Sequence, residues 1–310
     1  MPRTSSSASS AAVPEGASPE QTAPLPGGVE LCFQTFGDPT ADPLLLVLGL
    51  GGPMTWWDPA LCLQLADAGF FVIRYDNRDT GRSSRGRGRV TRQLLVRGFL
   101  GRESRPPYTL DDLAGDALGL LDHLGVESAH VVGVSMGGMI AQTMAVLHPD
   151  RVRSLTSIMS TTGGRTVGWQ DPRLLPLLLA RNVATREAYV ARSARLWKVI
   201  GSPGYPETKA AVHDRAGETW DRGVSAAGVA RQTLAILGQP DRSGRLRELT
   251  MPALVIHGLD DKMVRVSGGR ATSRAIPGSE LLLVPGMGHD LPAELYPTFV
   301  EAIRRTADRP

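Results

Sequence analysis

One short stretch, residues 129–142, constrains the fold of this 310-residue chain more than any other. It begins with an apolar, β-branched run that is typical of a buried parallel strand. Gly133, Ser135 and Gly137 follow with one residue between each pair, and then apolar residues recur at helical spacing. A serine between a strand and a helix, with small residues on both sides, predicts a sharp and strained turn. Such a turn holds the serine hydroxyl exposed at the end of the strand.

The five-residue motif alone is weak evidence, because a chain with 35 glycines can contain it by chance. A serine after a strand is also commonly no more than a helix N-cap. The rest of the chain favours the strained turn over these alternatives, because several other apolar strand patterns alternate with helical segments. The strand candidates are residues 29–36, 44–48, 70–75, 152–159, 251–257 and 281–284. This alternation predicts a mostly parallel sheet flanked by helices, in which ligands bind beyond the carboxyl ends of the strands.

The alternation is interrupted once, between residues 161 and 240, where four helical patterns occur in succession. They cover residues 172–180, 185–199, 207–221 and 224–237. A helical block inside an alternating core is best interpreted as an inserted cap. We therefore expect a core formed by residues 28–160 and 241–310 and a cap formed by residues 161–240.

Residues 1–27 are rich in serine, alanine, proline and glycine, and we expect a disordered tail there. The tail lacks the apolar segment of a signal peptide. No apolar run approaches the roughly 18 residues that a membrane-spanning helix requires. These features predict a cytoplasmic protein without an integral membrane segment, and they leave its oligomeric state open.

Charge is distributed unevenly along the chain. The formal net charge is +3, yet the segment from Arg82 to Arg105 contains eight arginines and a single acid, Glu103. Basic charge confined to one loop, without interleaved aromatic residues, argues against a nucleic-acid partner. The two cysteines, Cys32 and Cys62, match no metal or redox spacing, so we expect buried thiols, no metal and no cofactor.

Serine is a poor nucleophile unless a base lies within hydrogen-bond reach and a carboxylate orients that base. On a sheet of this kind the serine, the acid and the histidine follow in that order along the chain. Asp260 and Asp261 follow one strand, and His289 follows the next. We expect Ser135 as nucleophile, His289 as base and Asp261 as acid, because Asp260 is placed to bond the turn backbone. The residues alone leave Asp260 open, and an alternative role for His289 is to cap the last helix.

Acyl transfer also needs two preorganised N–H donors for the developing oxyanion. One is expected from the residue after the serine, Met136, and the second from the glycine loop 49–52, where we choose the N–H of Leu50. A phosphate-binding interpretation of this loop fails, because the loop lacks the Gly-x-Gly-x-x-Gly spacing and a Lys-Ser/Thr pair.

A polar turn follows the strand at residues 70–75. Its charged members are Asp76, Arg78, Asp79 and Arg82. We expect these side chains to form ion pairs that join loops near the site rather than to bind a metal.

Several segments together make the chain resemble a known family. They are residues 36–39, 72–83, 129–137, 254–256 and 285–289. The chain resembles the α/β-hydrolase superfamily along residues 29–306, and within it the actinobacterial esterases related to aclacinomycin methylesterase. The resemblance implies an α/β-hydrolase fold with a catalytic Ser135, Asp261 and His289, and an oxyanion hole from the Leu50 and Met136 amides. It supports Asp261 over Asp260. The arginine-rich segment departs from the family pattern, because it is longer and more basic.

The expected function is that of a serine hydrolase that cleaves carboxylic esters through an acyl-enzyme. Aromatic side chains in the cap favour an apolar small-molecule substrate, although they could equally pack the cap on itself; they are Trp169, Tyr189, Trp197, Tyr205 and Trp220. The alternatives are a thioesterase, a lactonase or a C–C bond hydrolase that uses the same three residues. A non-catalytic ligand-binding protein of this fold is a further alternative, against which the complete set of three residues argues.

Overall fold

The computed structural model describes residues 13–102, 105–174 and 183–310. In these residues the strands form one sheet of eight, in the order β1-β2-β4-β3-β5-β6-β7-β8. The strands are β1 (Gln21–Leu25), β2 (Val29–Phe36), β3 (Asp42–Val47), β4 (Phe70–Tyr75), β5 (Ala129–Val134), β6 (Val152–Ile158), β7 (Ala253–Gly258) and β8 (Glu280–Val284). The pairs β1–β2 and β2–β4 are antiparallel and the others are parallel. The predicted mostly parallel sheet is confirmed.

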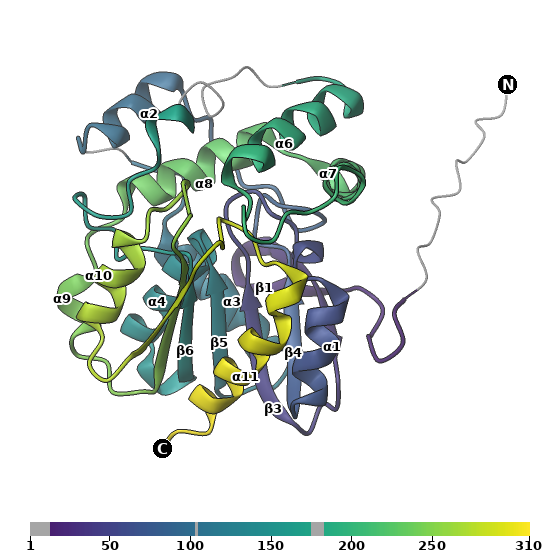
Figure 1. Ribbon diagram of the computed structural model, residues 1–310, viewed down its shortest axis with the longest axis vertical. Coiled ribbons are helices and arrows are strands. Elements are labelled where there is room, and N and C mark those ends of the chain that lie inside the picture. The colour runs from purple at the N-terminus through teal and green to yellow at the C-terminus, as the bar shows by residue number, and fades with distance from the viewer. Residues whose placement is uncertain (1–12, 103–104, 175–182) are drawn as a thin grey trace, which may run out of the picture.

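Helices cover both faces of the sheet (Figure 1). One face carries α3 (Leu110–His123), α4 (Met136–Leu147), α9 (Ser243–Leu246) and α10 (Ser267–Ala275), and the other carries α1 (Pro59–Asp67) and α11 (Tyr296–Ala307). Short 3₁₀ turns complete the layers at η1 (Pro26–Gly28), η2 (Met54–Trp56), η3 (Pro149–Arg151), η4 (Pro172–Leu174) and η5 (Ala293–Leu295). None of the helices in the described ranges is long and apolar enough to cross a membrane.

The central strands are buried on both faces, which explains their continuous apolar sequence. In β3, Leu45 and Val47 join the hydrophobic cluster that includes α3 and α4. Leu44 and Leu46 join the cluster on the opposite face with α1 and α11. Successive side chains of a strand point to opposite faces, so each central strand contributes to both clusters. This anchoring fixes the positions of the strand ends, where the candidate site residues lie.

Ordered structure begins earlier than the sequence predicted. Residues 21–25, within the expected disordered tail, form β1 and pair with β2. Ala23 and Leu25 are buried in the cluster below α3. The prediction of disorder through residue 27 is therefore wrong for this strand. The strand has only two inward-facing apolar residues, and the surrounding sequence is rich in small and polar residues, so the sequence shows no strand pattern there. Residues 1–12 lie outside the described ranges.

Three long helices follow β6 and lie over the carboxyl ends of the strands (Figure 1). They are α6 (Arg186–Ile200), α7 (Lys209–Gly223) and α8 (Ala226–Gly238), and we call them, with the loops between them, the cap. Their bounds agree with three of the four helical patterns. The fourth pattern, at residues 172–180, falls mostly outside the described residues. A further helix, α2 (Arg92–Phe99), lies at the same end of the molecule as α8 and coincides with the apolar part of the arginine-rich segment.

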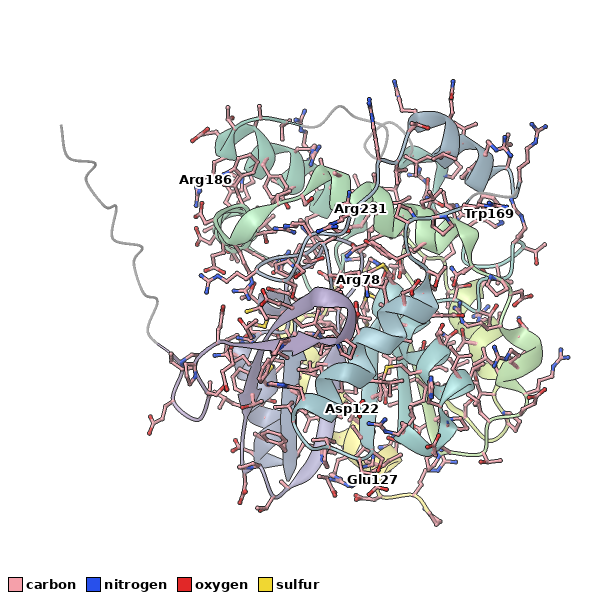
Figure 2. The ribbon with its side chains drawn as sticks, turned by 180° about the vertical axis from the view of Figure 1, so that it is seen from behind. Arg78, Asp122, Glu127, Trp169, Arg186 and Arg231 are labelled. Carbon is pink, nitrogen blue, oxygen red and sulfur yellow. The ribbon has the colours of Figure 1, made fainter. Side chains whose placement is uncertain are left out.

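Two buried ion pairs join the cap to the polar turn after β4. Arg222 of α7 contacts Asp76 at 2.7 Å, and Arg231 of α8 contacts Asp79 at 2.6 Å. Figure 2 shows Arg231 in the cap, above Arg78 of the same turn. The predicted pairing of these charges is confirmed, with the addition that two of the partners belong to the cap. Removal of one partner from such a pair leaves a buried charge, which typically costs about 3–5 kcal/mol.

The same turn is pinned to the core by further contacts. Arg78 contacts Asp116 of α3, and Arg82 contacts Glu20 beside β1 at 2.6 Å. Burial alone would raise the pKa of the Asp79 carboxyl, but hydrogen bonds from Arg231 and Tyr108 lower that pKa below its ordinary value. Asp79 therefore contributes stability above its ordinary pKa of about 3.9, and this contribution is lost as the pH falls through the lowered value.

The two cysteines are buried and unpaired with each other, as expected. Burial is the main reason why the pKa of each thiol, Cys32 and Cys62, is raised to about 12. A thiol with so high a pKa is protonated at neutral pH and is a poor nucleophile. Neither cysteine therefore competes with Ser135 as a candidate reactive group.

Candidate active site

The turn between β5 and α4 is packed so closely that only glycine fits at two of its positions. A Cβ atom at Gly133 would lie 2.2 Å from the carbonyl oxygen of Gly137, and one at Gly137 would lie 2.0 Å from the carbonyl oxygen of Val47. Ser135 between them has a φ of 57° and a ψ of −119°. Such a conformation costs an L-residue about 1–3 kcal/mol and persists only where the surroundings impose it. The sharp turn predicted from the glycine spacing is present.

Hydrogen bonds fix the backbone of Ser135 on both sides. Its N–H donates to the carbonyl of Ile158 at the end of β6, at 2.9 Å. Its carbonyl accepts from the Ser160 hydroxyl at 2.7 Å and from the Met139 N–H at 3.2 Å. The Ser135 side chain makes none of these bonds, so its hydroxyl stays directed toward the cavity. The alternative role of Ser135 as a side-chain helix cap is not observed.

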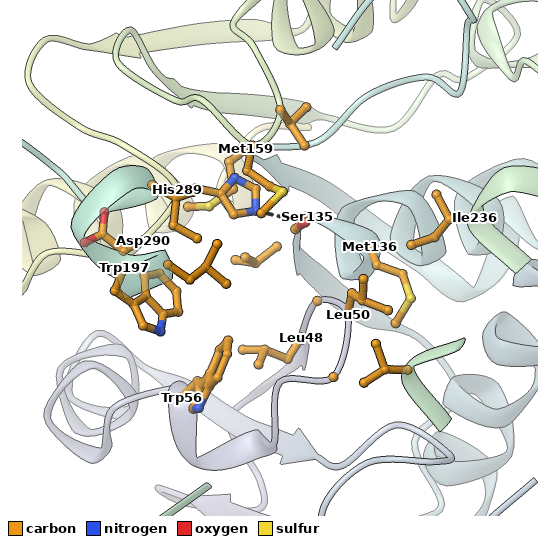
Figure 3. A pocket seen from close by; sticks show the side chains of 18 of the residues that line it. Leu48, Leu50, Trp56, Ser135, Met136, Met159, Trp197, Ile236, His289 and Asp290 are labelled. Carbon is orange, nitrogen blue, oxygen red and sulfur yellow. Dashed lines mark hydrogen bonds between the residues drawn. The ribbon is translucent and has the colours of Figure 1, made fainter. Parts of the chain in front are cut away.

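Ser135, His289 and Asp261 form one hydrogen-bonded series. The Nε2 atom of His289 lies 3.1 Å from the Ser135 Oγ (Figure 3), and its Nδ1 lies 2.7 Å from the Asp261 Oδ2. A hydrogen on Nδ1 donates to the carboxylate, which leaves Nε2 as the acceptor for the serine hydroxyl. In this arrangement His289 can remove the serine proton, and Asp261 can stabilise the imidazolium that results.

The two neighbouring aspartates occupy different environments. Asp261 is buried, and its second oxygen accepts the N–H groups of Met263 and Val264 at 2.8 and 2.9 Å. Asp260 is exposed and accepts the N–H of Gly286 at 3.0 Å. The structure thus brings Asp261, and not Asp260, to His289. Asp260 bonds a backbone N–H, as expected, but that N–H belongs to the loop after β8 and not to its own turn.

A second histidine approaches the same oxygen of the Asp261 carboxylate as His289 does. His257 is fully buried, and its Nε2 donates to the carbonyl of Val264 at 2.7 Å and lies 3.5 Å from the Asp261 Oδ2. Burial lowers the pKa of the His257 imidazole. A neutral imidazole at this position adds no charge beside Asp261. His257 is thus a core histidine whose imidazole bonds the backbone.

The predicted oxyanion donors lie at the same cavity as Ser135. Met136 is the first residue of α4, and Leu50 belongs to the glycine loop beyond β3. A Cβ at Gly49 would lie 3.1 Å from the Ser135 Cβ, so the glycine loop and the serine are in close contact. Within the described residues, neither the Leu50 N–H nor the Met136 N–H donates a hydrogen bond to another protein group. Both are therefore available to a ligand oxygen.

The glycine loop is held by a cap residue that sequence analysis missed. The buried Gln232 of α8 accepts the Gly51 N–H at 2.9 Å and donates to the Arg78 carbonyl at 2.9 Å and the Thr80 hydroxyl at 3.0 Å. The available signal was the pair Arg231–Gln232, which interrupts an otherwise apolar helix face. Polar residues at such positions commonly have buried partners.

A cavity of about 1270 Å³ extends from Ser135 and His289 up into the cap. Core side chains such as Leu48 and Met159 line the cavity together with the cap side chain Trp197 (Figure 3). The five cap aromatics that the sequence analysis singled out all line the cavity: Trp169, Tyr189, Trp197, Tyr205 and Trp220. Tyr189 of α6 also packs on Trp220 of α7 at a centroid distance of 5.5 Å, and Trp197 packs on Trp56 of the core at 5.4 Å. Packing within the cap is therefore present, and contact of these rings with a substrate stays a prediction.

No group of three or more His, Cys, Asp or Glu side chains suited to a metal ion occurs in the described parts of the chain. The candidate site consists of a serine, an imidazole, a carboxylate and two backbone N–H groups. These groups can carry out nucleophilic acyl transfer with their own proton donor and acceptor.

Comparison with known proteins identifies the family of this chain. Residues 42–294 match the family described as alpha/beta hydrolase fold. The chain is 30% identical over 301 residues to rhodomycin D methylesterase DauP of Streptomyces sp. (strain C5). The matched region covers 89% of this chain and 94% of the relative. It is 28% identical to 3-oxoadipate enol-lactonase 2 of Acinetobacter baylyi, over 82% of this chain and 84% of the relative. A hydrolase structure from Pseudomonas aeruginosa PA01 superimposes with a TM-score of 0.72 at 24% identity, covering 94% and 98% of the two chains.

The chain therefore belongs to the α/β-hydrolase fold family and is a hydrolase. The resemblance to methylesterases of the aclacinomycin type is confirmed, because the rhodomycin D methylesterases are relatives of that kind. The site residues lie where the β strands of this fold end, as the sequence predicted.

The contact at Gly137 generates a direct test of the turn. We expect Gly137→Ala to lower the free energy of unfolding by roughly 1–3 kcal/mol, because the new Cβ meets a backbone carbonyl that cannot move independently. Chemical denaturation measures this change. The matched control is Gly115→Ala in α3, where an added Cβ has no neighbour within 4 Å. Alanine there should raise stability by about 0.5–1 kcal/mol. Equal effects at the two positions would contradict the packing argument.

Proposed function

We propose that the protein is a serine hydrolase that cleaves carboxylic esters of apolar small molecules through an acyl-enzyme. The observation that carries the proposal is the hydrogen-bonded series Ser135–His289–Asp261 at the floor of an apolar cavity. In this proposal Ser135 is the nucleophile, His289 the base and Asp261 the residue that orients the imidazole.

In the first step the Ser135 Oγ attacks the carbonyl carbon of the ester while His289 takes the hydroxyl proton. The carbonyl oxygen becomes an oxyanion, which the N–H groups of Leu50 and Met136 stabilise. When the tetrahedral intermediate collapses, the bond to the alcohol oxygen breaks and His289 returns the proton to that oxygen. The products are a free alcohol and an ester of Ser135.

In the second step a water molecule replaces the alcohol. His289 takes a proton from the water, whose oxygen attacks the acyl carbon of the Ser135 ester. Collapse of this second intermediate releases the carboxylic acid and returns the proton to the Ser135 Oγ. His257 also lies close to the Asp261 carboxylate, but its lowered pKa keeps it neutral at neutral pH. The carboxylate charge is therefore available to stabilise the His289 imidazolium.

The cavity supports a bulky apolar substrate. Its volume of about 1270 Å³ exceeds the range of roughly 300–1,000 Å³ that is usual for small-molecule sites. Aromatic rings of α6 and α7 form part of its wall, and flat apolar groups pack well against such rings. The methylesterase activity named for the two rhodomycin D relatives is consistent with an ester substrate of this kind.

A lactone is the second candidate substrate, because the relatives include an enol-lactonase. Ring opening of a lactone uses the same attack by Ser135 and differs only in that the alcohol stays attached to the acyl group. Values of kcat/KM measured on a panel of acyl esters, acyl thioesters and lactones distinguish these substrates. Preference for esters by at least tenfold in kcat/KM, or about 1.4 kcal/mol, supports the proposal.

Fluorophosphonate labelling tests the nucleophile. The probe should modify Ser135 in the wild-type protein, because His289 activates this hydroxyl, and Ser135→Ala should not react. Mass spectrometry of the digested protein identifies the labelled residue. The proposal fails if the folded wild-type protein remains unlabelled or if the adduct lies on another residue.

Paired amide substitutions test the carboxylate. We expect Asp261→Asn to lower kcat by about 10⁴-fold, because an amide cannot hold the required imidazole tautomer or stabilise its charged form. Asp260→Asn is the matched control, since the exposed Asp260 bonds the Gly286 backbone and not the imidazole, and it should retain most of the activity. Steady-state kinetics on an activated ester measure both variants. Similar losses in the two would remove the distinction between these aspartates.

A further inference from the structure

Two glycine-containing loops that are far apart in the sequence lie against each other beside the site. The first, residues 200–204, begins at the last residue of α6 in the cap, and we call it the cap loop. The second, residues 285–290, follows β8 and carries His289, and we call it the histidine loop. Glycine allows their backbones to touch, because a Cβ at Gly288 would lie 2.4 Å from the Ile200 carbonyl oxygen and one at Gly204 would lie 2.8 Å from the Gly286 Cα.

Backbone hydrogen bonds connect the two loops directly. The N–H of His289 donates to the carbonyl of Ile200, the last residue of α6, at 2.7 Å. The N–H of Gly204 donates to the Gly286 carbonyl at 2.9 Å. The backbone of His289 is therefore bonded to the cap, while its imidazole is bonded to Asp261 and Ser135 of the core.

A single hydroxyl group adds the side-chain connection. The buried Ser202 Oγ accepts the N–H of Gly288 at 2.8 Å and donates to the Asp290 Oδ1. The backbone N–H of Ser202 also donates to the other Asp290 oxygen, at 3.3 Å. Ser202 thus bonds both residues that flank His289. Figure 3 shows Asp290 beside the helix that carries Trp197.

The contact between Ser202 and the histidine loop is buried, so its polar groups depend on their hydrogen bonds to each other. Burial raises the pKa of the Asp290 carboxyl above its ordinary value, although the bonds from Ser202 act in the opposite direction. A desolvated carboxylate depends on its remaining donors, and a buried backbone N–H without an acceptor is also unfavourable. Loss of the Ser202 hydroxyl removes one partner from each of these groups at once.

We propose that Ser202 is a positioning residue for His289, acting with Asp290 to hold the histidine loop against the cap. This inference rests on the proposed function of His289 as the base. Since α6 also contributes Tyr189 and Trp197 to the cavity wall, the element that contacts substrate is the one that holds the base.

The experiment compares Ser202→Ala with wild type in the rate and the end point of fluorophosphonate labelling, and in kcat and KM for p-nitrophenyl acetate. We expect the labelling rate and kcat to fall by about 10–100-fold, because displacement of a reacting group by about 1 Å costs rates of this order. The KM and the final fraction of labelled protein should stay near the wild-type values. A purely structural role would instead lower the final labelled fraction and leave the rate of the folded molecules unchanged.

The matched control is Ser83→Ala. Ser83 is also buried, and its hydroxyl also accepts a backbone N–H, from Cys32, and donates to an oxygen, the Asp76 carbonyl. It does not contact the histidine loop, so its loss should leave the labelling rate unchanged. Ser202→Thr retains a hydroxyl and should recover most of the rate.

Asp290→Asn provides an independent arm if Ser202→Ala does not fold. Its labelling rate should also fall at a normal end point. Wild-type rates in both Ser202→Ala and Asp290→Asn would overturn the positioning role while wild-type labelling at Ser135 still supports the proposed function. Absence of labelling in the wild type would instead contradict the proposed function itself.

Discussion

The site depends on a backbone contact at the end of the central strands. Gly137 approaches the carbonyl of Val47, and Gly133 approaches the carbonyl of Gly137, at separations that exclude any side chain. This contact joins the start of α4 to the end of β3 and forces Ser135 into its positive-φ conformation. Because the hydrophobic clusters on both faces fix β3 and β5, the serine is placed by the buried core of the molecule. The strain at Ser135 is thus balanced by packing elsewhere.

The cap is structurally part of the site rather than a cover over it. Arg222 and Arg231 place buried charges opposite the turn after β4, and Gln232 bonds the glycine loop that presents the Leu50 N–H. Ser202 bonds the loop that carries His289. The glycine loop and the loop that carries His289 therefore both have cap residues among their hydrogen-bond partners. Changes in the cap should consequently alter rate as well as substrate preference.

The parts predicted well from the sequence are those that local patterns determine. Strand periodicity and glycine spacing predicted the sheet. Residue order then predicted that Ser135, Asp261 and His289 lie at the carboxyl ends of its strands. The β1 strand was missed because only two of its residues face the core. The roles of Ser202 and Gln232 were missed because each depends on a partner more than 80 residues away, as the separations of 86 and 181 residues show. No local pattern contains such contacts, although the polar pair in α8 marked one of them.

The acyl-enzyme is the central claim, and mass spectrometry of acid-quenched protein during turnover tests it most directly. A p-nitrophenyl ester with a hindered acyl group, such as trimethylacetate, slows the attack of water and lets the intermediate accumulate. The account predicts a mass increase of one acyl group on the peptide that contains Ser135, together with loss of turnover in Ser135→Ala. Acylation of a different residue, or wild-type turnover by Ser135→Ala, would contradict it.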